Sequence, residues 1–111
     1  MYGVDIEIIQ QRVQDGYYLT RSHAVQHAVK EGFERKHIVE AVLNGKIIEA
    51  YPDDQRVLIC GSTTLLQTST IYLHVVCEYV DPVYVEFITA YIPEEIQWEN
   101  PPFRRRKRRK S

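Results

Sequence analysis

The sequence has only two cysteines and five glycines among 111 residues, and it has no apolar run near the roughly 18 residues that a membrane-spanning helix requires. The chain does not open with a basic segment leading into an apolar one, so no secretory signal is expected. Cys60 and Cys77 lie in separate apolar stretches, away from any metal or redox spacing, which predicts two buried, reduced thiols. We therefore expect a cytoplasmic protein that is not inserted into a membrane.

An apolar content of 44% in a chain of this length suffices for one hydrophobic core, whereas two domains would each be too small. No internal repeat divides the sequence. We expect a single α+β domain over residues 1–103, followed by a basic C-terminal tail over residues 104–111.

The net charge of −1 hides a strong division along the chain. Residues 1–103 contain seven basic and fifteen acidic residues, a net charge of −8, whereas residues 104–110 are seven consecutive cations. Such a tail attracts polyphosphate by counterion release, and it could equally lie on the acidic body or on an acidic partner protein. Its candidate nucleic-acid-binding residues are Arg104, Arg105, Arg106, Lys107, Arg108, Arg109 and Lys110.

Helical periodicity dominates the first part of the chain. Apolar side chains spaced by three or four predict helices over residues 4–13 and 21–31, and a third helix that contains residues 38–43. Gly32 can supply the left-handed conformation that ends many helices, and Asn44-Gly45 is a further stop. Thr20 is predicted to cap the N-terminus of the second helix.

After Gly45 the sequence changes to β-branched and aromatic residues. These predict strands over residues 46–51, 56–60, 70–79 and 84–92, with a loop over residues 61–69. Helices followed by consecutive strands are typical of an α+β fold in which N-terminal helices pack on one face of a four-stranded antiparallel sheet.

Strict alternation along the longest strand separates two faces. The apolar face, expected against the helices, consists of Ile71, Leu73, Val75, Cys77 and Tyr79. The opposite face, where a histidine could meet solvent or a ligand, consists of Tyr72, His74, Val76 and Glu78. In the last strand both sets of alternating residues are plausible inward faces, so its register stays open.

Several motifs together resemble the domain-of-unknown-function family 4258. They are Leu19-Thr20-x-x-His23-Ala24, Gly32, Asn44-Gly45-x-Ile47-Ile48-Glu49-x-Tyr51-Pro52-Asp53-Asp54, Leu73-His74-Val75-Val76, Ile88-Thr89-Ala90-Tyr91-x-Pro93 and Trp98. The resemblance covers roughly residues 17–106. It implies a fold similar to the RelE and BrnT toxins, RNA cleavage without a metal or other cofactor, and a partner antitoxin similar to the zinc-finger protein MqsA.

Metal-independent RNA cleavage needs a base for the 2′-hydroxyl, an acid for the leaving oxygen and a cation for the phosphorane. On the resemblance, His23 in the first turn of a helix is the candidate base and His74 the candidate acid. Arg21 is the nearest candidate for a phosphate contact, and Thr89 and Tyr91 could offer hydroxyls to the substrate. The alternative is that both histidines only bond backbone groups and hold helix to sheet.

His27 follows His23 by one helical turn and is a candidate substrate-binding residue. A metal site on this pair is not expected, because the general-base glutamate of the zinc-protease motif is absent. His27 and Glu31 stand where the family usually has arginines, and Ile71-Tyr72-Leu73-His74 replaces its usual Arg-Pro-Leu-His, so three cations suited to phosphate are missing. The sequence therefore leaves two hypotheses: a ribonuclease toxin, or a catalytically inactive module that binds a protein or nucleic acid.

Overall fold

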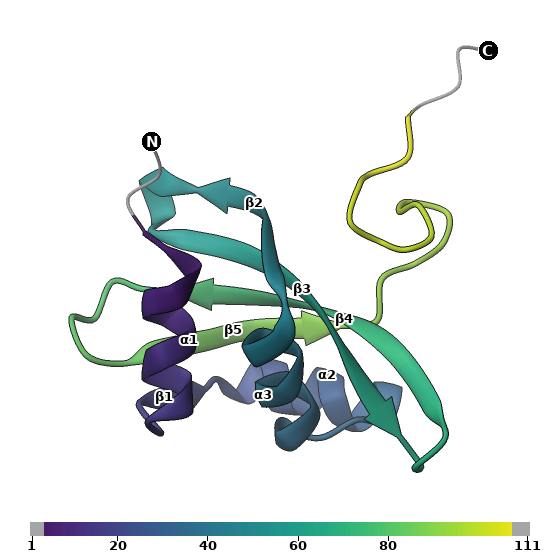
Figure 1. Ribbon diagram of the computed structural model, residues 1–111, viewed down its shortest axis with the longest axis horizontal. Coiled ribbons are helices and arrows are strands. Elements are labelled where there is room, and N and C mark those ends of the chain that lie inside the picture. Colours follow the sequence, from purple (N-terminus) through teal and green to yellow (C-terminus); the bar gives the residue numbers. More distant parts are fainter. Residues whose placement is uncertain (1–3, 108–111) are drawn as a thin grey trace.

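The computed structural model describes residues 4–107 and has the expected α+β architecture, with all α-helices before the last four strands and only one short strand between the first helix and the second (Figure 1). The helices are α1 (Ile6–Gln14), α2 (Ser22–Glu31) and α3 (Arg35–Asn44), and a 3₁₀ turn covers Pro52–Asp54. The strands are β1 (Tyr18–Thr20), β2 (Lys46–Tyr51), β3 (Arg56–Leu65), β4 (Ser69–Glu78) and β5 (Val85–Tyr91). Within these residues no helix is both long and apolar enough to cross a membrane.

The sheet has five strands in the order β1-β5-β4-β3-β2, so the prediction of four antiparallel strands is wrong in two respects. The additional strand, β1, lies at the edge and pairs in parallel with Val85–Phe87 of β5. A segment of three residues is too short to show an alternating pattern, and only its partner strand makes it part of the sheet.

Residues 61–69, predicted as a loop, mostly belong to a long antiparallel hairpin. β3 continues to Leu65 and β4 begins at Ser69, so the connection is only three residues long. Small and polar residues suggested a loop, but Gly61 serves a close approach between layers: a Cβ there would lie 1.8 Å from the carbonyl oxygen of Ala41 in α3. The glycine thus lets α3 pack directly on the strand.

The helix ends follow their local chemistry, with one correction. Asp5 caps α1 by accepting a 3.0 Å hydrogen bond from the Glu7 amide, and Gly32 ends α2 with φ of 83°. The N-cap of α2 is Arg21, whose side chain makes no capping hydrogen bond, and not Thr20 as predicted. Thr20 belongs to β1, and its hydroxyl is buried without a hydrogen-bond partner.

The core lies between the sheet and the helices, with α2 over β5 and α3 over β3 and β4. The predicted inward residues of β4 are confirmed, because Leu73, Val75 and Cys77 are fully buried in the main apolar cluster. Cys60 and Cys77 are buried free thiols, as expected.

A bulge explains why the register of β5 could not be read from alternation. Val76 pairs with Thr89 while Cys77 pairs with Phe87, so Ile88 is an additional residue in β5. Phe87 therefore faces the core together with Ala90, three positions later. Thr89 and Tyr91 stand on the other side of the sheet, which we call the outer face.

Candidate functional site

His74 lies on the outer face of β4, as predicted, but it does not meet solvent. The ring is fully buried, and its nearest aromatic neighbour is Trp98, with ring centroids 4.3 Å apart. Nε2 donates a 2.7 Å hydrogen bond to the carbonyl of Pro102, and Nδ1 is 3.3 Å from the Tyr91 hydroxyl, which donates to it. Burial lowers the pKa of His74, so the ring is neutral in this environment.

The cover over His74 comes from residues 93–107, which we call the C-terminal segment and which follows β5 (Figure 1). Besides Trp98 and Pro102, Phe103 of this segment packs edge-on against Tyr72, with ring centroids 5.4 Å apart. The expectation of an accessible histidine on this face is therefore wrong, because a segment more than twenty residues further along the chain folds over it.

Glu49 and Tyr51 of β2 hold the C-terminal segment through Arg105. The guanidinium makes two bonds to the Glu49 carboxylate, at 2.6 and 3.1 Å, and lies 4.6 Å from the centre of the Trp98 ring. Tyr51 donates its hydroxyl hydrogen to the same carboxylate. Hydrogen bonding from Arg105 lowers the pKa of Glu49, and desolvation raises the pKa of Tyr51 to about 12. Neither group changes its charge near neutral pH.

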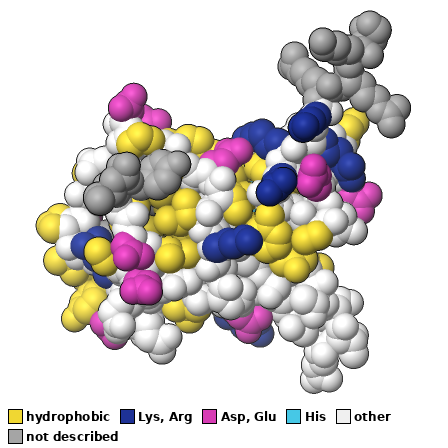
Figure 2. Space-filling model, turned by 45° about the horizontal axis from the view of Figure 1, so that its top comes forward, with side chains coloured by type: hydrophobic (Ala, Val, Ile, Leu, Met, Phe, Trp, Pro, Cys, Tyr) yellow, Lys and Arg dark blue, Asp and Glu magenta, His cyan; other side chains and the backbone are white. Residues whose placement is uncertain are grey.

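The start of the basic tail is part of this structure. Glu99 donates its amide hydrogen to the carbonyl of Arg104, and the Arg106 amide donates to Gln97, so the chain doubles back beside Trp98. Figure 2 shows Lys and Arg side chains gathered around this segment. The predicted tail residues Arg108, Arg109 and Lys110 lie outside the described residues.

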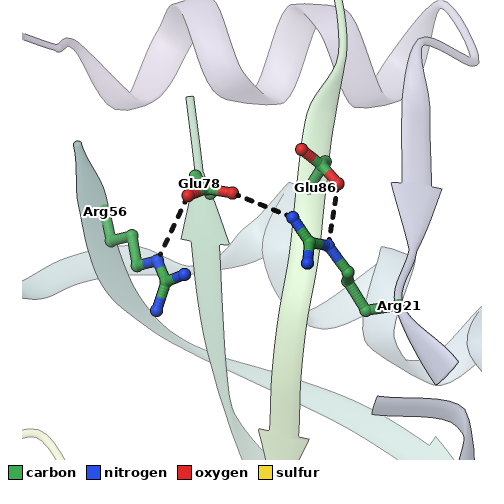
Figure 3. A network of polar contacts seen from close by, with 4 residues as sticks. All are labelled: Arg21, Arg56, Glu78 and Glu86. Carbon is green, nitrogen blue, oxygen red and sulfur yellow. Dashed lines mark hydrogen bonds and ion pairs between the residues drawn. The ribbon is translucent and has the colours of Figure 1, made fainter. Parts of the chain in front are cut away.

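Arg21 belongs to a four-residue network on the outer face and not to a site with His23 (Figure 3). Its Nε donates to Glu86 at 2.9 Å and its Nη2 to Glu78 at 3.4 Å. The Glu78 carboxylate also forms an ion pair with Arg56, whose Nε lies 3.4 Å from a carboxylate oxygen. Two carboxylates thus balance the two guanidinium groups. Thr89 lies on the same face of the sheet.

His27 sits where α2 passes the edge of β5. Its Nδ1 is 3.0 Å from the carbonyl oxygen of Ala90 and 2.8 Å from the Glu31 carboxylate, and the Ile92 amide donates to the other oxygen of Glu31 at 3.1 Å. Both acceptors face Nδ1, so a hydrogen resides on that nitrogen. β1 ends at Thr20, so these contacts satisfy backbone groups of β5 beyond the strand pairing.

His23 and His27 are neighbours on the exposed side of α2, with ring centroids 5.9 Å apart. Lys30 follows at the next turn, and positions 23, 27 and 30 form one stripe along the helix. The stripe borders a shallow space of about 450 Å³ that is more open than enclosed and is lined by α2 alone. The other residues lining that space are Val25, Gln26 and Val29.

The candidate base His23 and the candidate acid His74 do not share one pocket, so they cannot act together as the sequence suggested. His23 is exposed on α2, which covers the core face of the sheet, whereas His74 is sealed on the outer face. The alternation of β4 placed His74 on the right face, but the apolar stripe of α2, buried at Ala24 and Ala28, directs His23 elsewhere. The structure instead brings His23 to His27, and His74 to Tyr91.

Sequence reasoning missed Lys30, Glu31 and Glu49 as members of these clusters. The spacing of Lys30 and Glu31 from His27 was visible, since three and four residues separate neighbours on a helix. No local pattern links Glu49 to Arg105, because 56 residues separate them.

The family described as Domain of unknown function (DUF4258) matches residues 20–92, from the end of β1 to the residue after β5. Among curated proteins none matches the sequence.

Proposed function

The chain belongs to the DUF4258 family, and from this premise we propose that it is a metal-independent ribonuclease that captures RNA with its basic C-terminal residues. The observation that carries the proposal is the pair of imidazole rings, His23 and His27, at 5.9 Å beside an open, shallow space. In the cell, the activity would be that of a toxin restrained by an antitoxin protein.

The pair suits phosphodiester transfer because the reaction needs a base and an acid at one phosphate. One neutral imidazole takes the proton of the 2′-hydroxyl while its oxygen attacks phosphorus. The other, protonated, gives a proton to the departing 5′-oxygen, so the products are a 2′,3′-cyclic phosphate and a 5′-hydroxyl. Each such proton transfer contributes about 10²–10⁴-fold to a rate.

RNA capture is assigned to the basic tail because the rest of the chain is acidic. Residues 1–103 have a net charge of −8, so they repel a polyanion. Arg105 is paired with Glu49, so the other six tail cations would give a slope of log affinity against log salt of about −4 on single-stranded RNA, at about −0.7 per phosphate contact. The segment that carries these cations leaves β5 at Ile92, whose amide binds Glu31 one turn after His27.

The test is cleavage of a labelled single-stranded RNA by the full-length protein and by His23→Ala and His27→Ala. Each substitution should lower the rate by about 10²-fold or more, because it removes an acid or a base. His74→Gln should retain activity, since that ring is sealed away from this space. RNA that stays intact with the wild-type protein in excess, or cleavage that persists in both alanine variants, would overturn the proposal.

A catalytically inactive binding module is the second candidate, and the contacts that hold the C-terminal segment favour it. Glu49, Arg105 and His74 all serve to hold the C-terminal segment on the outer face. On this alternative, the protein binds RNA with a steep salt dependence and never cleaves it. Substituting Arg104, Arg106 and Lys107 by Gln would then reduce the salt slope by about 2. An unchanged slope would show that the tail does not hold the RNA.

A further inference from the structure

A phosphorane intermediate carries more negative charge than the phosphodiester from which it forms, so a third group must face it. Arg21 was the candidate in the sequence, but its guanidinium is held by Glu86 and Glu78 on the outer face. Arg21 precedes His23 by only two residues, but two carboxylates already balance its charge, so it is poorly suited to this task.

Lys30 is the cation that the structure places beside the two histidines. It is exposed in the last turn of α2, three residues after His27 and seven after His23, and it borders the same space. A lysine on such a stripe can reach along the helix surface toward the rings, because its stem is long and flexible.

Lys30 has no ion-pair partner within residues 4–107, a property that it shares with Arg12, Arg35 and Lys46 of the folded body. Arg21 and Arg56 share Glu78, and Lys46 lies over the Phe103 ring at 4.4 Å. A cation without a carboxylate partner keeps its full charge for a ligand. It also avoids the cost of breaking an existing ion pair when the ligand binds.

We infer that Lys30 is a catalytic residue that stabilises the phosphorane formed between His23 and His27. The inference rests on the proposed ribonuclease function. It assigns a base, an acid and a cation to one stripe of α2, which gives all three parts of the reaction to a ten-residue helix. The bound group is the non-bridging oxygen pair of an RNA phosphodiester.

The experiment compares steady-state cleavage of one RNA oligonucleotide by the full-length protein, Lys30→Ala, Lys30→Arg and Lys36→Ala. Lys36 is the matched control, because it is an exposed helical lysine away from that space, 3.9 Å from Glu34. Lys30→Ala should lower kcat by about 10²-fold with little change in KM, since the contact strengthens in the transition state. Lys30→Arg should restore most of kcat, and Lys36→Ala should match the wild type.

The outcomes separate the two claims. A wild-type protein that cleaves RNA while Lys30→Ala retains its kcat would overturn the role of Lys30 and leave the histidine pair standing. An equal loss in Lys30→Ala and Lys36→Ala would also overturn it, because only general charge would then matter. A wild-type protein that does not cleave RNA would overturn the proposed function together with this inference.

Discussion

Glu49→Gln should loosen the C-terminal segment from the outer face. The substitution keeps the shape of the side chain but replaces a charged acceptor, which binds Arg105 at 2.6 and 3.1 Å, by a neutral one. Exposed ion pairs contribute about 0–1 kcal/mol, and hydrogen bonds to charged groups about 1.5–3 kcal/mol. The side chain of Arg105 is 57% exposed and that of Glu49 is 26% exposed. We therefore expect the substitution to cost an intermediate amount, about 1–2 kcal/mol, of the free energy that holds the segment on the sheet.

A loss of this size increases the open fraction of the segment about 5- to 30-fold. The assay uses Trp98, which is the single tryptophan of the sequence and only 3% exposed. In Glu49→Gln the fluorescence emission of Trp98 should shift to the red, and iodide should quench it more strongly because the ring is more accessible. Glu95→Gln is the matched control, because this exposed carboxylate makes no ion pair in the described part of the chain. Identical quenching in wild type and Glu49→Gln would refute the view that the ion pair holds the segment.

Three further predictions concern stability. Gly61→Ala should lower the free energy of unfolding by about 1–3 kcal/mol in urea titrations, because a Cβ would lie 1.8 Å from the Ala41 carbonyl; full wild-type stability would contradict the packing of α3 on β3. Leu66→Asn should raise it by about 0.5–1 kcal/mol, since Leu66 is 90% exposed and has φ of 51°, a conformation that asparagine tolerates better; a loss of stability would show that this leucine makes contacts. His74 should destabilise the fold in acid. Its pKa is lowered from 6.5 by burial, so the stability it contributes is complete above pH 6.5 and is lost as pH falls toward the lowered value. The free energy of unfolding, measured as a function of pH, should show this loss in the wild type and not in His74→Gln.

The sequence predicted elements that depend on local periodicity. Helix α2 ends at Gly32 as expected, and the inward face of β4 was assigned from alternation alone. β1 could not be predicted, because it is defined by its pairing with β5, a strand more than a dozen residues away. The bulge at Ile88 could not be predicted either, because it is defined by one additional residue in the pairing of β5 with β4. Local pattern fixes the face of a side chain, and only the assembled sheet fixes its neighbours.

In the candidate site, too, local spacing could be predicted from the sequence and long-range contacts could not. The stripe on α2 is local, so the spacing of His23, His27 and Lys30 was present in the sequence. The burial of His74 depends on Trp98 and Pro102, which reach it only after the chain has completed the sheet. A motif match could therefore identify His74 as a residue of interest without revealing that the protein itself covers it.

The central claim is that the side chains of α2 cleave RNA through its 2′-hydroxyl. The most direct measurement is analysis of the product ends after the full-length protein acts on an RNA oligonucleotide and on the same oligonucleotide with 2′-deoxy sugars. The account predicts 2′,3′-cyclic phosphate and 5′-hydroxyl ends from the RNA and no cleavage of the deoxy substrate. Cleavage of both substrates, or of neither, would contradict it.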